Sequence, residues 1–282
     1  MNSSPSSAAQ AARAQVAARL LDVRRTAGLK AVELAASCGW HKSKVSRLEN
    51  ARMLPSDADI RAWCTACRAP DQVSDLIAKT RDADLLYVEW KRLHRDGIRR
   101  MQESAVPLYE GTSVFRVYCH NVVPGLSQVH GYAEALMNLI SDFQGTPNDS
   151  PEAATARLER SRVIYEGQHR FVLLIEQAVL GYRFGTPSVM AGQLGYLLEV
   201  MSLPSVAFGI VPQPAERTMW PLETFMIFDK SRVQVETLTA EINITAPDEI
   251  AAYSRAFDRL RDMAVFGPKA RALILKEIAA LG

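Results

Sequence analysis

A segment near the N-terminus holds two short helical patterns separated by a glycine, and it constrains the fold more than any other part of the 282 residues. Gly39 can adopt a positive φ without strain, as a tight turn between two helices requires. Residues 31–38 form the first pattern. In the second, over residues 41–50, Val45 and Leu48 lie three positions apart on one face. We therefore expect two helices joined by a sharp turn, with the apolar face of the second helix against a core.

The opposite face of the second predicted helix is polar. It carries a row of cations and hydrogen-bonding side chains. A short helix with one apolar and one such polar face suits the DNA major groove, where cations meet phosphates and base edges. We therefore predict a DNA-binding surface formed by Lys30, His41, Lys42, Ser43, Lys44, Ser46, Arg47, Asn50 and Arg52.

This segment resembles the helix-turn-helix of the Xre/Cro type of repressor. The residues in register with the family pattern are Leu34, Ala35, Gly39, Trp40, Ser43, Val45, Ser46, Arg47, Leu48, Glu49, Asn50, Pro55 and Ser56. The resemblance implies an all-α domain of five helices that binds DNA at specific sequences.

Three residues depart from that pattern. Ala31 replaces a common Gln near the start of the first helix of the motif, which puts one expected phosphate contact in question. His41 replaces the usual Ser or Thr before the second helix and is a weaker N-cap. Ala51 replaces the Gly after Glu-Asn, which suggests that the left-handed position of this loop lies elsewhere.

Length and charge divide the chain. A chain of 282 residues favours two domains, and 48% apolar with 23% charged residues allows a packed core. Residues 1–70 carry eleven cations and five anions, a net charge of +6, so the remainder carries −4. A basic N-terminal part suits contact with phosphates.

The divisions we expect are a disordered tip at 1–7, the DNA-binding domain at 8–81, a helical connector at 82–112, and a partner-binding and dimerisation domain at 113–282.

The N-terminus has the Ser, Ala and Arg content of a transit peptide, but a helical reading accounts for it better. Val16, Leu20 and Val23 would face the core of the first domain as part of its first helix. Arg13 and Arg19 interrupt any secretory apolar region, and no later segment approaches the ~20 apolar residues of a membrane span. We therefore expect a cytoplasmic protein.

Four cysteines allow two interpretations. The spacings Cys38-x2-His41 and Cys64-x2-Cys67 are those of metal ligands. The same cysteines fall on predicted inner helix faces, which favours buried reduced thiols over a zinc site or a redox switch. We expect no metal and no cofactor.

The segment after the predicted DNA-binding helix continues as helices. Ser56 and Asp59 have the spacing of a capping box. Residues 71–81 would form the fifth helix, and a long helix would follow over 83–106, bent or softened at Gly97. The cations of this long helix could be a solvated face or a second phosphate contact: Lys91, Arg92, Arg95, Arg99 and Arg100.

From about Val114 onward, β-rich runs alternate with helical patterns. The predicted strands lie in residues 114–124, 170–180, 205–212, 222–230 and 233–238. The predicted helices lie at 127–142, 151–166, 188–201, 247–266 and 268–281. This order indicates an α+β domain, with one sheet and helices on a face.

The second half resembles a large group of actinomycete Xre-type regulators with a long C-terminal domain of formerly unknown function. The blocks that carry the resemblance lie in order at residues 123–136, 157–165, 176–180 and 253–261. This group is described as antitoxin-like and includes WhiJ-like developmental proteins. The resemblance implies sequence-specific DNA binding and, commonly, a small partner protein encoded nearby, but no known ligand.

The C-terminal half shows none of the sequence patterns of a catalytic site. Nucleophile elbows, phosphate loops and paired metal ligands are absent from this half of the sequence, so we expect no enzyme. The turn at residues 123–126 could line a pocket, although it more simply directs the following helix. Arg157, Arg160 and Arg162 could bind an acidic partner or form a solvated helix face.

The sequence thus predicts a transcriptional regulator that acts as a homodimer on a pseudo-palindromic operator. Lys42, Ser43, Lys44 and Arg47 would contact bases and phosphates, and Arg52 and Lys30 the DNA backbone. Two alternatives stay open. The chain could be an antitoxin-like module that sequesters a small protein, or a sensor whose C-terminal domain binds a small molecule.

Overall fold

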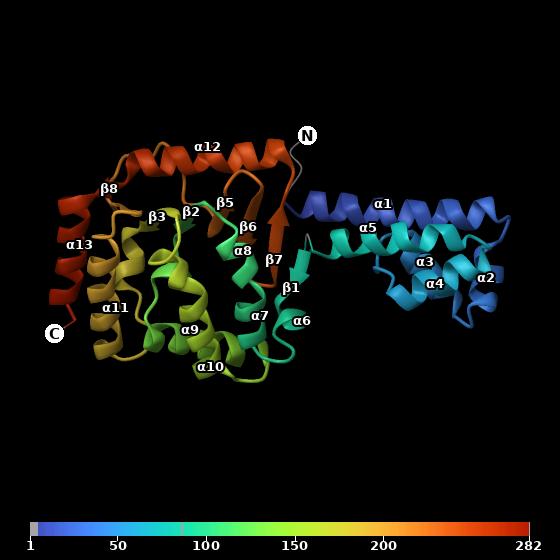
Figure 1. Cartoon of the computed structure of the whole chain (residues 1–282), viewed down its shortest axis with the longest axis horizontal. Coiled ribbons are helices and arrows are strands. Elements are labelled where there is room, and N and C mark those ends of the chain that lie inside the picture. Colours follow the sequence, from blue (N-terminus) through green and yellow to red (C-terminus); the bar gives the residue numbers. More distant parts are fainter. Residues whose placement is uncertain (1–4, 86, 282) are drawn as a thin grey trace. The chain divides into compact units, whose positions relative to one another are not determined.

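The computed structural model describes residues 5–85 and 87–281. The chain divides into two compact units, Met1–Val88 and Glu89–Gly282 (Figure 1). Each unit has its own apolar core: the first is built from buried residues between Val16 and Ala83, and the second from residues between Ile98 and Ile274. No helix in the described part of the chain combines the length and the apolar composition that crossing a membrane requires.

The first unit is helical, as predicted. Its elements are α1 (Pro5–Thr26), α2 (Ala31–Ser37), α3 (Lys42–Glu49), α4 (Asp57–Ala66), the short 3-10 helix η1 (Pro70–Gln72) and α5 (Val73–Leu85). α1 begins inside the predicted tip of residues 1–7, and residues 1–4 lie outside the described residues. Trp63 is fully buried, and its indole Nε1 donates to the carbonyl of Leu20 at 3.1 Å. This bond fixes α4 against α1 at the centre of the unit.

The single long helix expected over residues 83–106 is not formed. Residues from 87 onward instead make β1 (Tyr87–Glu89), α6 (Trp90–Leu93), α7 (Arg99–Ser104) and α8 (Val106–Glu110). Gly97 has a φ of +99°, and Asp149 packs so closely on it that no Cβ would fit. The Asp149 carboxylate accepts hydrogen bonds from the backbone N–H groups of Ile98 and Arg99, at 2.7 and 3.0 Å. The carboxylate of Asp149, which is distant in sequence, therefore caps the start of α7 after the break at Gly97.

The cations of this segment are only partly described. Arg95, Arg99 and Arg100 are exposed, and Arg99 donates to Glu103 at 2.6 Å. The side chains of Lys91 and Arg92 lie outside the described residues. The three described arginines therefore agree with the solvated face.

The second unit contains a mixed sheet in the order β7-β6-β5-β2-β3-β4-β8. Its parallel strands are β2 (Val114–Cys119), β3 (Arg170–Glu176) and β4 (Val206–Val211). Antiparallel strands flank them: β5 (Phe225–Phe228), β6 (Arg232–Glu236) and β7 (Ala240–Ile244) on one side and β8 (Val265–Phe266) on the other. Phe115 is aligned with Phe171 on one neighbour and with Phe228 on the other. The predicted α+β class is confirmed.

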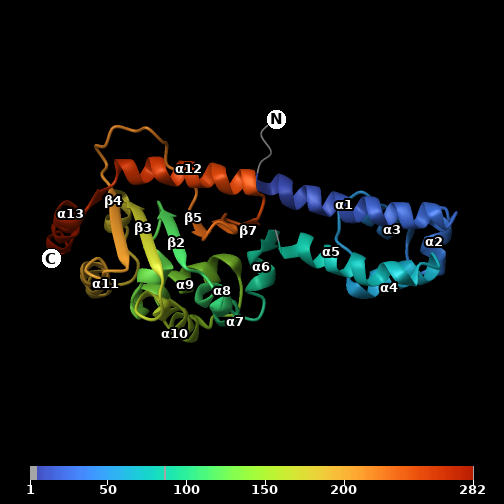
Figure 2. The same ribbon diagram turned by 45° about the horizontal axis from the view of Figure 1, so that its top comes forward.

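Helices cover both faces of this sheet, so the prediction of helices on one face is wrong. They are α9 (His130–Gln144), α10 (Ser150–Ser161), α11 (Pro187–Val200), α12 (Pro247–Met263) and α13 (Gly267–Ala279), with 3-10 helices η2 (Gly125–Ser127), η3 (Arg162–Ile164) and η4 (Gln177–Gly181). α12 lies across one face of the sheet, on the side opposite to α9 and α11 (Figure 2). Its Tyr253 and Phe257 stack edge-on against Phe225 of the sheet, at ring-centroid distances of 5.1 and 6.3 Å.

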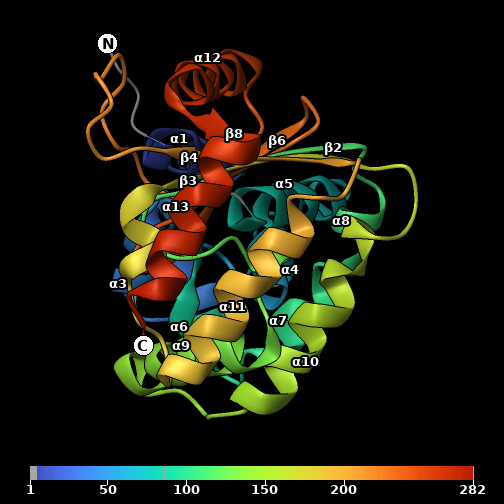
Figure 3. The same cartoon turned by 90° about the vertical axis from the view of Figure 1, so that its left-hand side faces the viewer.

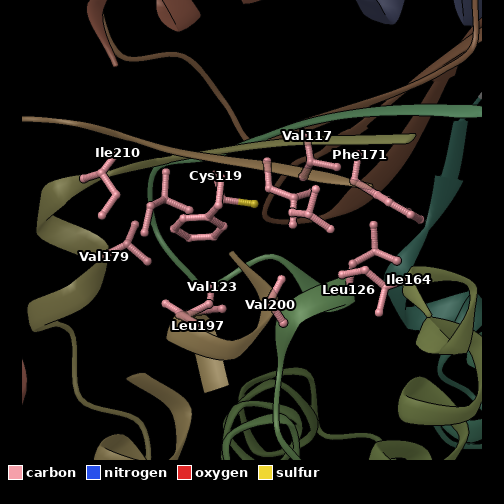
Figure 4. Close-up of a cluster of buried hydrophobic side chains, with 14 of the residues drawn as sticks. Val117, Cys119, Val123, Leu126, Ile164, Phe171, Val179, Leu197, Val200 and Ile210 are labelled. Atoms are coloured by element: carbon pink, nitrogen blue, oxygen red, sulfur yellow. The ribbon is translucent and has the colours of Figure 1, made fainter. Parts of the chain in front are cut away.

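The other face of the sheet carries the larger core. α9, α11 and α13 lie on this side, and α10 packs against α9 (Figures 1 and 3). Val117 and Cys119 of β2 point from the sheet toward Leu197 and Val200 of α11 (Figure 4). The turn before η2 adds Val123, which is fully buried in the same cluster. The turn at residues 123–126 is thus part of the apolar core of the second unit.

Candidate nucleic-acid interface

The turn between α2 and α3 has the geometry that the sequence predicts. Gly39 takes a φ of +66°, and the backbone N–H of Trp40 returns to the carbonyl of Ala35 at 2.8 Å. His41 is the N-cap of α3: its ring Nδ1 accepts from the backbone N–H of Ser43 at 3.3 Å. This is a longer contact than a hydroxyl cap commonly makes, in keeping with the expectation of a weaker cap.

The inner face of α3 is sealed into the core of the first unit. Val45 and Leu48 are both buried, as their spacing predicts. At the end of α3, Glu49 forms a bidentate pair with the guanidinium of Arg24 on α1, and both side chains are only 12% exposed. The same guanidinium also donates to the carbonyl of Leu29 at 2.6 Å. α3 is therefore held at a fixed position on α1 by charge as well as by packing.

Lys44 is engaged within the domain. Its ammonium donates to the carboxylate of Asp59 at 2.5 Å and lies over the ring of Trp40, at 4.3 Å from the centroid. Asp59 also completes the predicted capping box with Ser56, which is confirmed by bonds of 3.1 Å in both directions. Lys44 thus joins α3 to the start of α4, which gives it a structural role that the sequence pattern did not indicate.

The outer face of α3 is exposed and carries most of the predicted contact residues. Exposed side chains on and beside this face are Lys30, His41, Lys42, Ser43, Ser46, Arg47, Asn50 and Arg52. Within the described part of the chain, no carboxylate lies within 4.0 Å of the side-chain ammonium or guanidinium groups of Lys30, Lys42, Arg47 and Arg52. These four cations therefore carry charge that no ion pair compensates.

Asn50 and Ala51 shape the end of α3. The amide of Asn50 donates to the carbonyl of Ser46 at 2.7 Å, so these two predicted contact residues are also bonded to each other. Ala51 itself adopts the left-handed conformation, with a φ of +55°. The suggestion that this position lies elsewhere in the loop is wrong. The backbone N–H of Arg52 bonds to the carbonyl of Arg47 at 2.9 Å and forces the left-handed turn at Ala51.

Two residues that position this face were not predicted to do so. No pattern in the sequence singles out Arg24, and the spacing to Ser56 marks Asp59 only as part of a cap. Glu49 belongs to the family pattern, so a search for a cation able to reach it could have found Arg24. The pairing of Lys44 with Asp59 has no such signal, because it depends on the packing of α4 beside α3.

The cysteines lie where core side chains lie. Cys64 and Cys67 are buried in the core of the first unit, and burial raises the pKa of the Cys67 thiol to about 11. The Cys38 thiol bonds to the carbonyl of Ala62 at 3.6 Å. Across the described residues, no three His, Cys, Asp or Glu side chains are grouped as metal ligands.

The most buried ion pair that the structure describes in the second unit holds a loop against the sheet. Glu176, at the end of β3, forms a bidentate pair with Arg217 at 2.7 and 2.8 Å. The hydroxyl of Tyr118 donates to the same carboxylate at 2.9 Å, and burial raises the pKa of that phenol. These bonds occupy both oxygens of Glu176 and fasten the loop that carries Arg217 to the sheet.

Two protein-family models match the chain. A model described as a helix-turn-helix domain matches residues 15–76, which include α2, α3 and α4. A model described as a domain of unknown function (DUF5753) matches residues 104–276, which is more than half of the chain. No curated protein and no solved structure shows significant similarity to this sequence.

Proposed function

Because the chain belongs to the DUF5753 family and carries an N-terminal helix-turn-helix domain, we propose that it is a sequence-specific transcriptional regulator of the Xre type. One observation carries this proposal. α3 buries Val45 and Leu48 and leaves Lys42 and Arg47 exposed, with no carboxylate partner among the described residues. Such a helix can enter the major groove without breaking any bond of the fold.

The proposed contacts follow from this exposure. Arg47 would pair with a guanine edge, where a bidentate bond discriminates by about 1–3 kcal/mol. Lys42 and Ser43 would contact bases or phosphates at the start of the helix, with Ser46 and Asn50 farther along it. Arg52, Lys30 and His41 would contact the backbone. Lys44 contributes mainly by holding α3 on α4, because its ammonium already has a carboxylate partner.

We further propose a homodimer on a pseudo-palindromic operator, with half-sites about one helical turn apart (~10 bp). In this arrangement residues 8–81 bind DNA, residues 82–112 connect, and residues 113–282 mediate dimerisation and regulation. The protein would act in the cytoplasm and would not be an enzyme. No catalytic role is needed for any residue of this scheme.

A second candidate function is an antitoxin-like role, in which the second unit sequesters a small protein encoded nearby. It is favoured by Leu139 and Phe143, one turn apart on α9 and exposed to 56% and 69%. Large apolar side chains exposed together on a helix are typical of protein-binding faces. In this reading DNA binding serves autoregulation alone.

The test is selection of DNA fragments from a genomic pool by the purified full chain, followed by sequencing of what is retained. We expect the wild type to enrich a palindrome and the double variant Lys42→Ala/Arg47→Ala to lose that enrichment. Arg61→Ala is the matched control, because Arg61 is an exposed cation on α4 outside the α3 face. Equal enrichment by all three proteins would refute the assignment of α3 as the reading helix.

The same proteins distinguish the second candidate. If none of them enriches DNA, a pull-down with wild type and a Leu139→Ser/Phe143→Ser variant tests the protein-binding role. A small protein retained by the wild type and released by that variant would support the antitoxin-like function. Retention by both would place the partner elsewhere on the chain.

A further inference from the structure

Of the arginines of α10, Arg160 is buried and Arg157 is partly buried, contrary to the reading of residues 157–162 as a solvated face. Arg160 is 9% exposed, and Arg157 is mostly covered. Arg162, two residues beyond Arg160, is the solvated one: its side chain is 62% exposed and pairs with Glu159 at 3.0 Å. Burying two guanidinium groups costs free energy unless their charges and donors are satisfied.

The partners of these two arginines are neutral. Arg157 donates from Nε to the amide oxygen of Gln102 at 3.2 Å and from Nη1 to that of Gln128 at 2.8 Å. Arg160 lies over the ring of Tyr109, at 4.3 Å from its centroid. In the described part of the chain neither guanidinium has a carboxylate within 4.0 Å. The cluster therefore holds two positive charges with no anion in contact.

Two donors of the cluster have no acceptor. The buried Nε of Arg160 and the buried amide nitrogen of Gln102 both lack a hydrogen-bond partner among the described residues. The two arginines converge on Gly125 in the turn before α9. A Cβ at that position would lie 3.5 Å from Nη2 of Arg160 and 3.9 Å from Nε of Arg157. A glycine at position 125 therefore keeps this side of the two guanidinium groups free of a side chain.

The charges nearby do not neutralise the cluster. Burial, and then the charge of Arg160, lowers the pKa of Arg157 to about 10, so Arg157 still carries its charge at neutral pH. Glu236, at the end of β6, is the carboxylate that most raises the pKa of Arg157. Glu236 is exposed at this strand end, and within the described residues it forms no ion pair with either arginine. Among the described residues, the guanidinium groups of Arg157 and Arg160 therefore lack a negatively charged hydrogen-bond acceptor.

We propose that Arg157 and Arg160, with the amide of Gln102, form a binding site for the carboxylate or phosphate group of a small ligand. Guanidinium groups bind such oxygens through paired, charge-assisted bonds. Arg160 also lines a recess of about 410 Å³ between α8 and the end of α10, whose other lining residues are Val106, Glu110, Glu159, Arg162, Val163, Glu166, Gly167 and His169. Because three carboxylates line it, the part of the ligand seated there would be neutral or cationic. The recess has room for the remainder of a small molecule. The site lies wholly in the second unit and does not depend on the proposed DNA binding.

The site is tested by calorimetric titration of the full chain with inorganic phosphate and, separately, with acetate, at constant ionic strength. We expect saturable binding of at least one anion, and which anion binds identifies the ligand class. Arg160→Met should weaken that binding about tenfold or more, since it removes a charged donor. Arg255→Met is the matched control: Arg255 is exposed on α12 and does not line the recess, so its loss should leave binding as in the wild type.

A second variant tests the site without removing a charge. Gly125→Ala places a methyl group where the two guanidinium groups converge, at ordinary contact distances from both. It should fold normally, as judged by circular dichroism and thermal unfolding, and should also weaken binding about tenfold or more. Binding unchanged in both Arg160→Met and Gly125→Ala would assign the anion to the basic first unit and overturn the proposal. So would the absence of saturable binding by either anion in the wild type.

Discussion

At the scale of single residues, Ala51 shows the clearest conflict between residue type and backbone conformation. A left-handed conformation costs a residue with a Cβ roughly 1–2 kcal/mol, and Ala51 adopts it with a φ of +55°. Ala51→Gly would remove that strain but add conformational entropy to the unfolded chain, which offsets part of the gain. We expect a net stabilisation of about 0.5–1 kcal/mol, measured by urea unfolding of the first unit in the full chain.

The matched control for that substitution is Ala36→Gly. Ala36 is exposed on α2, where its backbone is helical, so glycine there should destabilise by about 1 kcal/mol. The two substitutions make the same chemical change with opposite expected signs. If Ala51→Gly destabilised the protein as Ala36→Gly does, the conformation assigned to Ala51 would be wrong.

Asp59 links stability to pH. Burial raises the pKa of this carboxyl, but the hydrogen bonds from Lys44 and Ser56 and the charge of Lys44 together hold it below its ordinary value of 3.8. The folded state therefore takes up this proton less readily than the unfolded chain. The resulting stabilisation is complete above the unfolded pKa and is lost as pH falls through the lower folded pKa.

We therefore expect Asp59→Asn to be less stable than the wild type near neutral pH, with the difference closing as the pH falls below 3.8. The measurement is thermal unfolding of both proteins over that pH range. Asp57→Asn is the control, because Asp57 pairs with Arg81 at an exposed position. A gap between wild type and Asp59→Asn that stayed constant with pH would contradict the role of this carboxylate.

At the scale of elements, the pair of Arg24 and Glu49 connects α1 to the end of α3. Arg24→Met would leave the Glu49 carboxylate nearly buried without its partner, at a cost of about 3 kcal/mol. The double variant Arg24→Met/Glu49→Met should recover at least 1 kcal/mol of that loss. Urea unfolding of the two single variants and the double variant measures this coupling. Simple additivity of the two losses would show that the pair does not act as a unit.

Elements defined by local signals could be predicted from the sequence. Gly39 marked the turn, Val45 and Leu48 marked the inner face of α3, and Ser56 with Asp59 marked the start of α4. Each of these signals depends on neighbours within four positions along the chain. The exposed face of α3 followed from the same periodicity, and so most of the candidate interface was visible without a structure.

Elements defined by distant contacts could not be predicted. The start of α7 depends on Asp149, about fifty residues away, and so the segment before it looked like one continuous helix. The burial of Arg157 depends on Gln102 and Gln128, which no periodicity along α10 indicates. β7 was missed because an Ala and two polar residues interrupt its short apolar run, although three of its five residues are buried. Pairing with β6, and not composition, makes it a strand.

At the scale of the whole molecule, the two units have separate cores and should unfold separately. Leu48 belongs to the core of the first unit and Leu194 to that of the second, and each is almost fully buried. Replacing either with Ala should cost about 2–5 kcal/mol in its own unit. Because the second unit is larger, the same loss should shift its melting temperature less. We therefore expect two transitions in scanning calorimetry of the full chain.

In that experiment Leu48→Ala should lower one melting temperature by about 8 °C or more and leave the other unchanged, since small domains shift by roughly 4–8 °C per kcal/mol. Leu194→Ala should do the reverse, with a shift of about 4 °C or more. Anions that bind at Arg157 and Arg160 should raise only the transition that Leu194→Ala lowers, because binding stabilises the unit that holds the site. A single transition lowered by both substitutions would mean that the two cores unfold as one cooperative body. Anion binding in the second unit would then stabilise the DNA-binding unit directly.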